Sequence, residues 1–131
     1  MKALIALPLA SASLCAVAML VPPPVVASPT QDVGAQVFGT CRACHMLQAG
    51  AKSGLGPNLN GLFGRKAGSL AGYDYSPALK ASGIVWNAQS LDQFLASPGT
   101  KVPGTRMVIK VTDPAKRAAL IAYLSTETSK K

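Results

Sequence analysis

Two thiols and an imidazole stand close together in the segment Cys41-Arg42-Ala43-Cys44-His45. The spacing C-x-x-C-H is typical of covalent haem attachment, because two sulfurs three positions apart can both reach the vinyl groups of one porphyrin. Cys41 and Cys44 would each form a thioether, and His45 would direct a ring nitrogen at the iron. The segment therefore predicts one haem c, bound covalently through two thioethers.

A zinc site and a redox dithiol are the alternative interpretations of these cysteines. Zinc would need a second pair of ligands, but Cys15 is the only other cysteine and His45 the only histidine. A redox dithiol of the thioredoxin kind accompanies a βαβ pattern, which this sequence lacks. Haem attachment is the interpretation that uses all three side chains.

An iron bound by His45 has a sixth position that the protein either fills or leaves open. Methionine is the usual filler in electron carriers. Met46 adjoins His45 and would lie on the same side of the haem, whereas Met107 follows a loop with proline and glycine far along the chain. Met107 is the candidate second ligand, and a core position for this methionine is the alternative.

The first residues of the chain have the features of a secretory signal peptide. Lys2 supplies a positive start, residues 3–21 carry no charge, and Val25-Val26-Ala27 offers small residues before a cleavage point after Ala27. We predict a cleaved signal peptide over 1–27 and one domain over 28–131, in the periplasm of a bacterium. A retained membrane anchor is the alternative, because the uncharged stretch approaches a membrane-spanning length.

The chain is strongly basic, with 13 Lys and Arg against 5 Asp and Glu and a formal net charge of +8. Only Lys2 of these residues would leave with the signal peptide. Such a balance favours partner proteins with acidic docking surfaces. Nucleic acid is disfavoured, because the basic residues are scattered, aromatic residues make up 5% of the chain and export removes that target. A charged surface that serves solubility alone is the alternative.

The spacing of apolar residues predicts an all-α domain of roughly four short helices with almost no strand. The expected helices run from Asp32, as N-cap, to Cys44; from Ser76-Pro77 to Gly83; from Asn87, as N-cap, to Ser97, where Pro98 stops the helix; and from Asp113-Pro114 onward.

The segment 48–72 differs from these helices, because seven of its residues are glycine. That composition excludes long regular elements and indicates a loop that folds closely over the haem. A domain of about a hundred residues has a marginal core of its own, so the haem would be the largest apolar piece of that core.

The motifs of the chain, taken together, resemble those of class I cytochromes c, most closely the branch of bacterial cytochrome c2 and mitochondrial cytochrome c. The resemblance covers nearly all of 28–131 and implies helices and glycine-rich loops wrapped around one covalently bound haem. It is specific because many short motifs occur in one order: Cys41 to His45, Gly56-Pro57-Asn58-Leu59, Gly61-Leu62-Phe63-Gly64-Arg65, Gly72-Tyr73, Tyr75, Gly83-Ile84 with Trp86-Asn87, Pro103-Gly104-Thr105 with Met107, and Leu120-Ile121-Ala122-Tyr123-Leu124.

The resemblance also implies roles for individual residues. His45 and Met107 match the two axial ligands of the iron. Pro57 matches a residue that accepts a hydrogen bond from the ring nitrogen of histidine that faces away from iron, which fixes the imidazole. Three further positions match residues that contact the haem propionates, where a buried carboxylate needs donors: Arg65, Tyr75 and Trp86.

The fold closure and the departures from the family pattern follow from the same comparison of motifs. First-helix residues Gly34 and Phe38 match residues that pack on Leu120 and Tyr123 of the last helix.

Three positions depart from the family pattern toward a more apolar pocket. Phe94 replaces a tyrosine near the methionine sulfur, Leu79 replaces a polar residue beneath the haem, and Ile109 stands where an aromatic residue often covers the haem edge.

The predicted function is a soluble periplasmic one-electron carrier, a monomer and not an enzyme, in which both axial positions are filled. The resemblance implies a quinol-oxidising complex as donor and a photosynthetic reaction centre or terminal oxidase as acceptor. A membrane-anchored cytochrome with an uncleaved N-terminus is one alternative. A haem enzyme or gas-binding protein is another, which would need an open sixth position.

Overall fold

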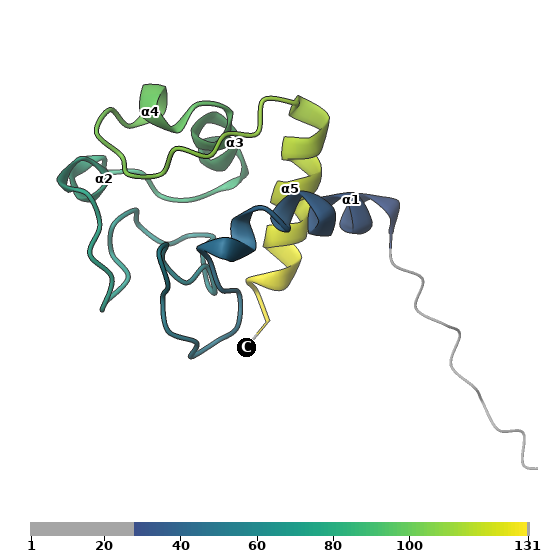
Figure 1. Ribbon diagram of the computed structural model, residues 1–131, viewed down its shortest axis with the longest axis horizontal. Helices are drawn as coiled ribbons and strands as arrows, with labels where there is room; N and C mark the ends of the chain where they lie inside the picture. Colours follow the sequence, from purple (N-terminus) through teal and green to yellow (C-terminus); the bar gives the residue numbers. More distant parts are fainter. Residues whose placement is uncertain (1–27, 131) are drawn as a thin grey trace, which may run out of the picture.

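The computed structural model describes residues 28–130, which form five α-helices, one 3-10 helix and connecting loops (Figure 1). The predicted signal peptide, 1–27, lies outside the described residues. Within 28–130 there is no strand, only one isolated bridge between Lys66 and Val85. No helix in this range combines the length and apolar character needed to cross a membrane. The domain is therefore all-α, as predicted.

The first helix, α1 (Pro29–Phe38), begins and ends earlier than predicted. Ser28 is its N-cap and Pro29 its first residue, because proline fits the start of a helix. The prediction of Asp32 as N-cap is wrong, since Asp32 lies in the first turn, where its negative charge faces the positive end of the helix dipole. The predicted single helix to Cys44 is also wrong. Gly39 and Thr40 favour helix weakly, so the chain breaks there and forms the separate 3-10 helix η1 (Cys41–Ala43).

Helices α1 and α5 (Pro114–Glu127) cross at close range (Figure 1). A Cβ atom on Gly34 would stand 2.5 Å from the Cβ of Tyr123 and would collide with the carbonyl of Ala119, so only glycine fits at the crossing. The ring centroids of Phe38 and Tyr123 are 5.7 Å apart. Phe38 and Leu120 are the largest fully buried side chains. The predicted packing of the first helix on the last is confirmed.

Helices α2 and α3 begin directly after the residues that were predicted to start them, Ser76 and Asn87. In α2 (Pro77–Ala81) the backbone N–H of Leu79 donates to the Ser76 hydroxyl at 3.2 Å. In α3 (Ala88–Ala96) Asn87 and Ser90 form a reciprocal capping box. The buried side of α3 consists of Leu91, Phe94 and Leu95, which are apolar residues at helical spacing.

Pro98 ends α3 as predicted, but it also starts a helix. Ser97 has an extended φ of −158°, which breaks α3, and Pro98 then occupies the first position of the single-turn α4 (Pro98–Lys101). The sequence predicted no helix between Pro98 and Asp113, which is wrong for this turn, because proline is disfavoured in the interior of a helix but not in its first turn. The rest of that segment, from Val102 to Asp113, is loop, and Asp113 caps α5 by accepting from the N–H groups of Ala115 and Lys116.

The glycine-rich segment 48–72 contains no helix or strand, as predicted. It is attached to the C-terminal end of the domain, because Gly61 N–H donates to the Thr128 carbonyl at 2.8 Å and the Asn60 side chain donates to the Lys130 carbonyl at 2.9 Å. Gly61 has a φ of +66°, a conformation that favours glycine. The loop is thus fixed to α5 and forms a wall of the site.

Candidate haem-binding site

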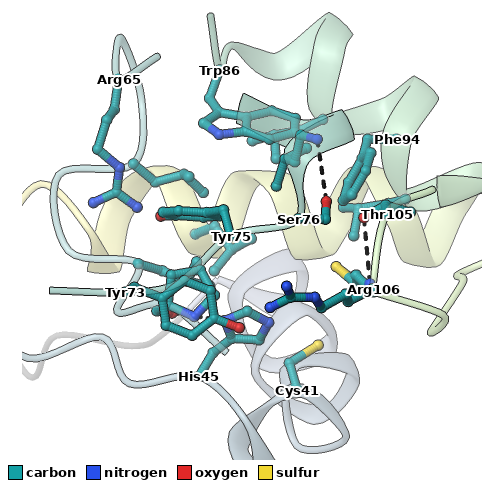
Figure 2. A pocket seen from close by; sticks show the side chains of 18 of the residues that line it. Cys41, His45, Arg65, Tyr73, Tyr75, Ser76, Trp86, Phe94, Thr105 and Arg106 are labelled. Atoms are coloured by element: carbon teal, nitrogen blue, oxygen red, sulfur yellow. Dashed lines mark hydrogen bonds between the residues drawn. The ribbon is translucent and has the colours of Figure 1, made fainter. Parts of the chain in front are cut away.

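One large cavity opens between the loops and helices α3 and α5. Its empty volume is about 860 Å³, part of it open to solvent, and its walls are mostly apolar. The cavity brings together seven of the eight predicted site residues: Cys41, His45, Pro57, Arg65, Tyr75, Trp86 and Met107. In Figure 2, His45, Tyr73 and Arg106 converge on the same space, and Trp86 and Phe94 stand above it.

The ring of His45 is held in one orientation. Its Nδ1 donates to the Pro57 carbonyl at 2.8 Å, which is the predicted contact and leaves Nε2 available in the cavity. A Cβ atom on Gly56 would stand 2.5 Å from Cε1 of this ring, so the backbone of 56 lies directly against the imidazole. Burial lowers the pKa of His45, and the bond to Pro57 opposes that shift only in part. The imidazole is therefore neutral, the form that binds a metal.

The two cysteines lie on and just after the short helix η1. The backbone N–H of Cys44 donates to the Cys41 carbonyl at 3.0 Å, and both thiols are free. Cys41 lines the cavity, whereas Cys44 is half-buried beside it and is not a lining residue. Burial, and secondarily the neighbouring Cys44, raise the pKa of the Cys41 thiol. The turn thus presents the sulfur of Cys41 to the apolar cavity and holds Cys44 three residues further along.

Met107 reaches the cavity from the loop between α4 and α5. Its side chain packs against the core, while its neighbours Val108 and Ile109 are 77% and 45% exposed. Met46 is 45% exposed and does not line the cavity. Of the two methionines within 28–130, only Met107 is therefore in position to act in the site.

Arg65, Tyr75 and Trp86 supply hydrogen-bond donors at another part of the wall. The guanidinium of Arg65 donates to the carbonyls of Asn60 at 2.9 Å and Asn58 at 3.0 Å. Burial lowers the pKa of Arg65 and raises the pKa of Tyr75. Only two of the five N–H groups of Arg65 are used in this way, so others remain for an anion.

Of the three residues that depart from the family pattern, two line the cavity and one does not. Phe94 is buried and packs edge-on against Trp86, with ring centroids 5.1 Å apart. Leu79 also lines the cavity, so both residues make it more apolar. Ile109 does not line the cavity and is half-exposed, so its effect lies outside the pocket wall.

Asn58 is a structural residue of the site to which the sequence analysis assigned no role. It is only 6% exposed, and its side-chain amide donates to the carbonyls of Gln48 and Ala51 at 2.8 and 2.7 Å. Its side-chain oxygen accepts from the backbone N–H of Asn60 at 2.7 Å. Asn58 thereby holds the loop that places Pro57 against His45. An asparagine directly after proline in a glycine-rich segment was the signal that could have marked it.

These side chains fit a haem. A neutral imidazole nitrogen, a thioether sulfur and two thiols are ligand and attachment groups for an iron porphyrin. The apolar walls suit the ring, and Arg65 with Tyr75 suits its carboxylates. The zinc alternative finds no support, because residues 28–130 hold no group of three or more His, Cys, Asp or Glu that could bind a metal ion.

Comparisons with known proteins agree with this fit. The family model described as Cytochrome c matches residues 31–128. The chain is 45% identical over 95 residues to cytochrome c2 of Rhodomicrobium vannielii, covering 72% of this chain and 76% of that protein. It is 48% identical over 97 residues to cytochrome c-550 of Ancylobacter novellus, covering 71% and 91% respectively. The solved structure of cytochrome cH from Methylobacterium extorquens matches with a TM-score of 0.68 at 46% identity, covering 73% of this chain and 97% of that one.

The fold and the site define a class I c-type cytochrome. With these matches, the chain belongs to the cytochrome c family. It therefore carries one covalently bound haem c and functions as an electron carrier rather than as an enzyme.

Proposed function

We propose that this cytochrome is a soluble, monomeric, periplasmic one-electron carrier with His45 and Met107 as axial ligands and with Cys41 and Cys44 as thioether attachment points. The observation that carries the proposal is that His45 and Met107 line one cavity from two segments far apart in the sequence. A bound haem supplies one-electron exchange between Fe(II) and Fe(III).

The protein's own residues would keep that exchange free of rearrangement. Pro57 orients His45, and Arg65, Tyr75 and Trp86 would contact the haem carboxylates. A site with a histidine and a methionine in place leaves no coordination position for a substrate. Apolar walls exclude water, so little solvent would have to reorganise when the charge changes.

The surface supports acidic partner proteins. Most acidic side chains of the described domain already have contacts: Asp74 with Lys80 and Arg106, Asp92 with Arg117, Glu127 with Lys130, and Asp113 with the start of α5. The excess charge is therefore positive. Arg42, Lys101 and Lys110 are exposed near the segments that carry the site residues. We propose that these residues orient the protein toward a quinol-oxidising complex and toward a reaction centre or terminal oxidase.

Spectroscopy of the protein purified from a periplasmic fraction tests the ligand set. The ferric form should have the methionine-to-iron charge-transfer band, and the ferrous form should bind carbon monoxide slowly. Rapid binding of carbon monoxide without that band would instead favour a haem enzyme or gas-binding protein.

Intact mass spectrometry tests the export proposal. The mass should equal residues 28–131 plus one haem that survives acid-acetone extraction, with Ser28 at the N-terminus. Recovery of a chain that starts at Met1 from membrane fractions would favour the membrane-anchored alternative.

A further inference from the structure

Residues 103–110 of the Met107 loop, of which 105–107 line the cavity, have few polar connections to the rest of the molecule. The loop is next held at Val111, whose backbone N–H donates to the Leu95 carbonyl at 2.8 Å. Thr105 N–H donates to the Val102 carbonyl, and Met107 N–H donates to the Thr105 hydroxyl at 3.4 Å. Both of these hydrogen bonds stay within the loop. In the described part of the chain, only the side chain of Arg106 joins 103–110 to a distant segment by hydrogen bonds.

Asp74 is the residue that Arg106 contacts in the wall of the cavity. One terminal nitrogen of Arg106 donates to the Asp74 carbonyl at 2.8 Å and to a carboxylate oxygen, Oδ2, at 3.3 Å. The other oxygen, Oδ1, accepts from Lys80 of α2 at 3.3 Å. Both Asp74 and Arg106 line the cavity. The two segments are 32 residues apart in sequence, so this pair joins two separate parts of the cavity wall.

Two further observations place the carboxylate in this role. Lys80 and Arg106 lower the pKa of Asp74, so the carboxylate is ionised at neutral pH and attracts both cations. The loop also packs closely on α2, because a Cβ atom on Gly104 would stand 3.2 Å from the Cβ of Ala78. The ion pair therefore holds two surfaces that already touch.

We propose that Asp74 is a positioning residue that, through Arg106, holds the Met107 loop closed over the cavity and so sets how often Met107 leaves the iron. This inference rests on the proposed function, in which Met107 is a ligand. Asp74 would thus help to retain Met107 as a ligand. This role differs from attraction of acidic partners, for which the negative charge of Asp74 would be unfavourable.

The exposure of the pair determines the size and the signature of the effect. The side chains of Asp74 and Arg106 are 78% and 60% exposed, and exposed ion pairs contribute little to global stability. Opening of one loop is a smaller transition than global unfolding. Because the pair between Asp74 and Arg106 must break for the loop to open, even a weak pair changes the opening rate measurably. Salt screens exposed charges. Loop opening should therefore accelerate with ionic strength as long as the carboxylate is present.

The test measures imidazole binding to the ferric haem-loaded protein at saturating imidazole, where loss of Met107 limits the rate. Asp74→Asn should accelerate binding by about two- to fivefold at low salt. Arg106→Gln, which also loses the bond to the Asp74 carbonyl, should accelerate it by about tenfold. Glu127→Gln is the control, because it removes one acidic charge from an ion pair outside the cavity wall, that of the 25% exposed Glu127 side chain with Lys130. It should leave the rate unchanged.

Two additional readouts separate loop positioning from a general loss of stability. The wild-type rate should rise with salt, and the rate of Asp74→Asn should not. The urea midpoints of Asp74→Asn and Glu127→Gln should agree, and Asp74→Glu should restore a slow rate. The inference is overturned if Asp74→Asn binds imidazole at the wild-type rate, or if Glu127→Gln accelerates binding equally. The proposed function fails separately, if wild type and Met107→Ala bind imidazole equally fast.

Discussion

The two sides of the cavity are built differently. On the side of His45, the backbone N–H of Gly56 donates to the Cys44 carbonyl at 2.9 Å and that of Leu59 donates to the Met46 carbonyl at 2.8 Å. Asn58 adds further bonds within the same loop. On the side of Met107, one arginine connects residues 103–110 to a distant segment within the described domain. The histidine side is therefore fixed by many contacts, and the methionine side is closed by few.

This difference indicates which ligand can exchange. A residue held by a network leaves only when the network opens, whereas a residue on a weakly connected loop leaves when that loop moves. The histidine side should thus respond to mutation through global stability, and the methionine side through local opening. Four predictions test that division, from the largest expected effect to the smallest.

Phe38→Ala should cause the largest loss. Phe38 is 1% exposed and packs on Tyr123 just before the turn that carries the cysteines. Removal of a buried phenylalanine costs about 3–5 kcal/mol of unfolding free energy. Urea unfolding of the haem-loaded protein measures this loss. Val33→Ala on the same helix, at a position 40% exposed, should cost about 0.5 kcal/mol or less; an equal loss there would contradict the assigned core.

Asn58→Ala should destabilise the histidine side by about 2 kcal/mol, because it leaves the carbonyls of Gln48 and Ala51 without their donor. The loss should appear in the urea midpoint. Asn60→Ala, which removes a bond to the exposed Lys130 carbonyl, should have a smaller effect. If Asn58→Ala accelerated imidazole binding while the urea midpoint stayed unchanged, the histidine side would not be the fixed one.

Met107→Ala should cost only about 1–2 kcal/mol in stability, since the side chain is half-buried. Its effect should be on ligand binding: the charge-transfer band should disappear, and carbon monoxide and cyanide should bind rapidly. Met46→Ala, a substitution of the exposed methionine beside His45, should change neither property. Loss of the band in Met46→Ala would reverse the assignment of the two methionines.

Lys101→Glu should have the smallest effect, confined to encounters with partners. Surface charge acts mainly on the association rate and is screened over roughly 10 Å at 0.1 M salt. Stopped-flow oxidation by the physiological partner should therefore be slower and less dependent on salt than in wild type. Lys130→Glu, at the C-terminal end, should matter less. If the wild-type oxidation rate does not change with salt concentration, apolar contacts around Val108 and Ile109 govern docking instead.

The sequence predicted those parts of the fold that depend on neighbouring residues. Ser76, Asn87 and Asp113 cap helices because each side chain bonds backbone groups two or three residues away, and such bonds are readable as a local pattern. Pro98 was misjudged because proline is compatible with both the end of one helix and the start of the next.

The residues that escaped prediction depend on contacts across the molecule. Nothing near Gly56 in sequence shows that its backbone must lie against the ring of His45, and nothing near Asp74 shows that Arg106 faces it. Seven of the residues that line the cavity were predicted from their motifs, because resemblance to a family carries information on such distant contacts indirectly. The bonds of Asn58 are different, because its partners lie within ten residues of it, although they surround it only after the loop has closed.

The crossing of α1 and α5 has a consequence for how the protein is made. The contact joins the first described helix to the last, so α1 has no partner until nearly the whole chain has been synthesised and, on the proposed export, has crossed the membrane. Contact between residues so distant in sequence also costs loop-closure entropy, because the intervening chain must be brought together. Until then the segment Cys41–His45 lies in an open chain. Both cysteines would therefore be made, and accessible for haem attachment, before the two helices can close.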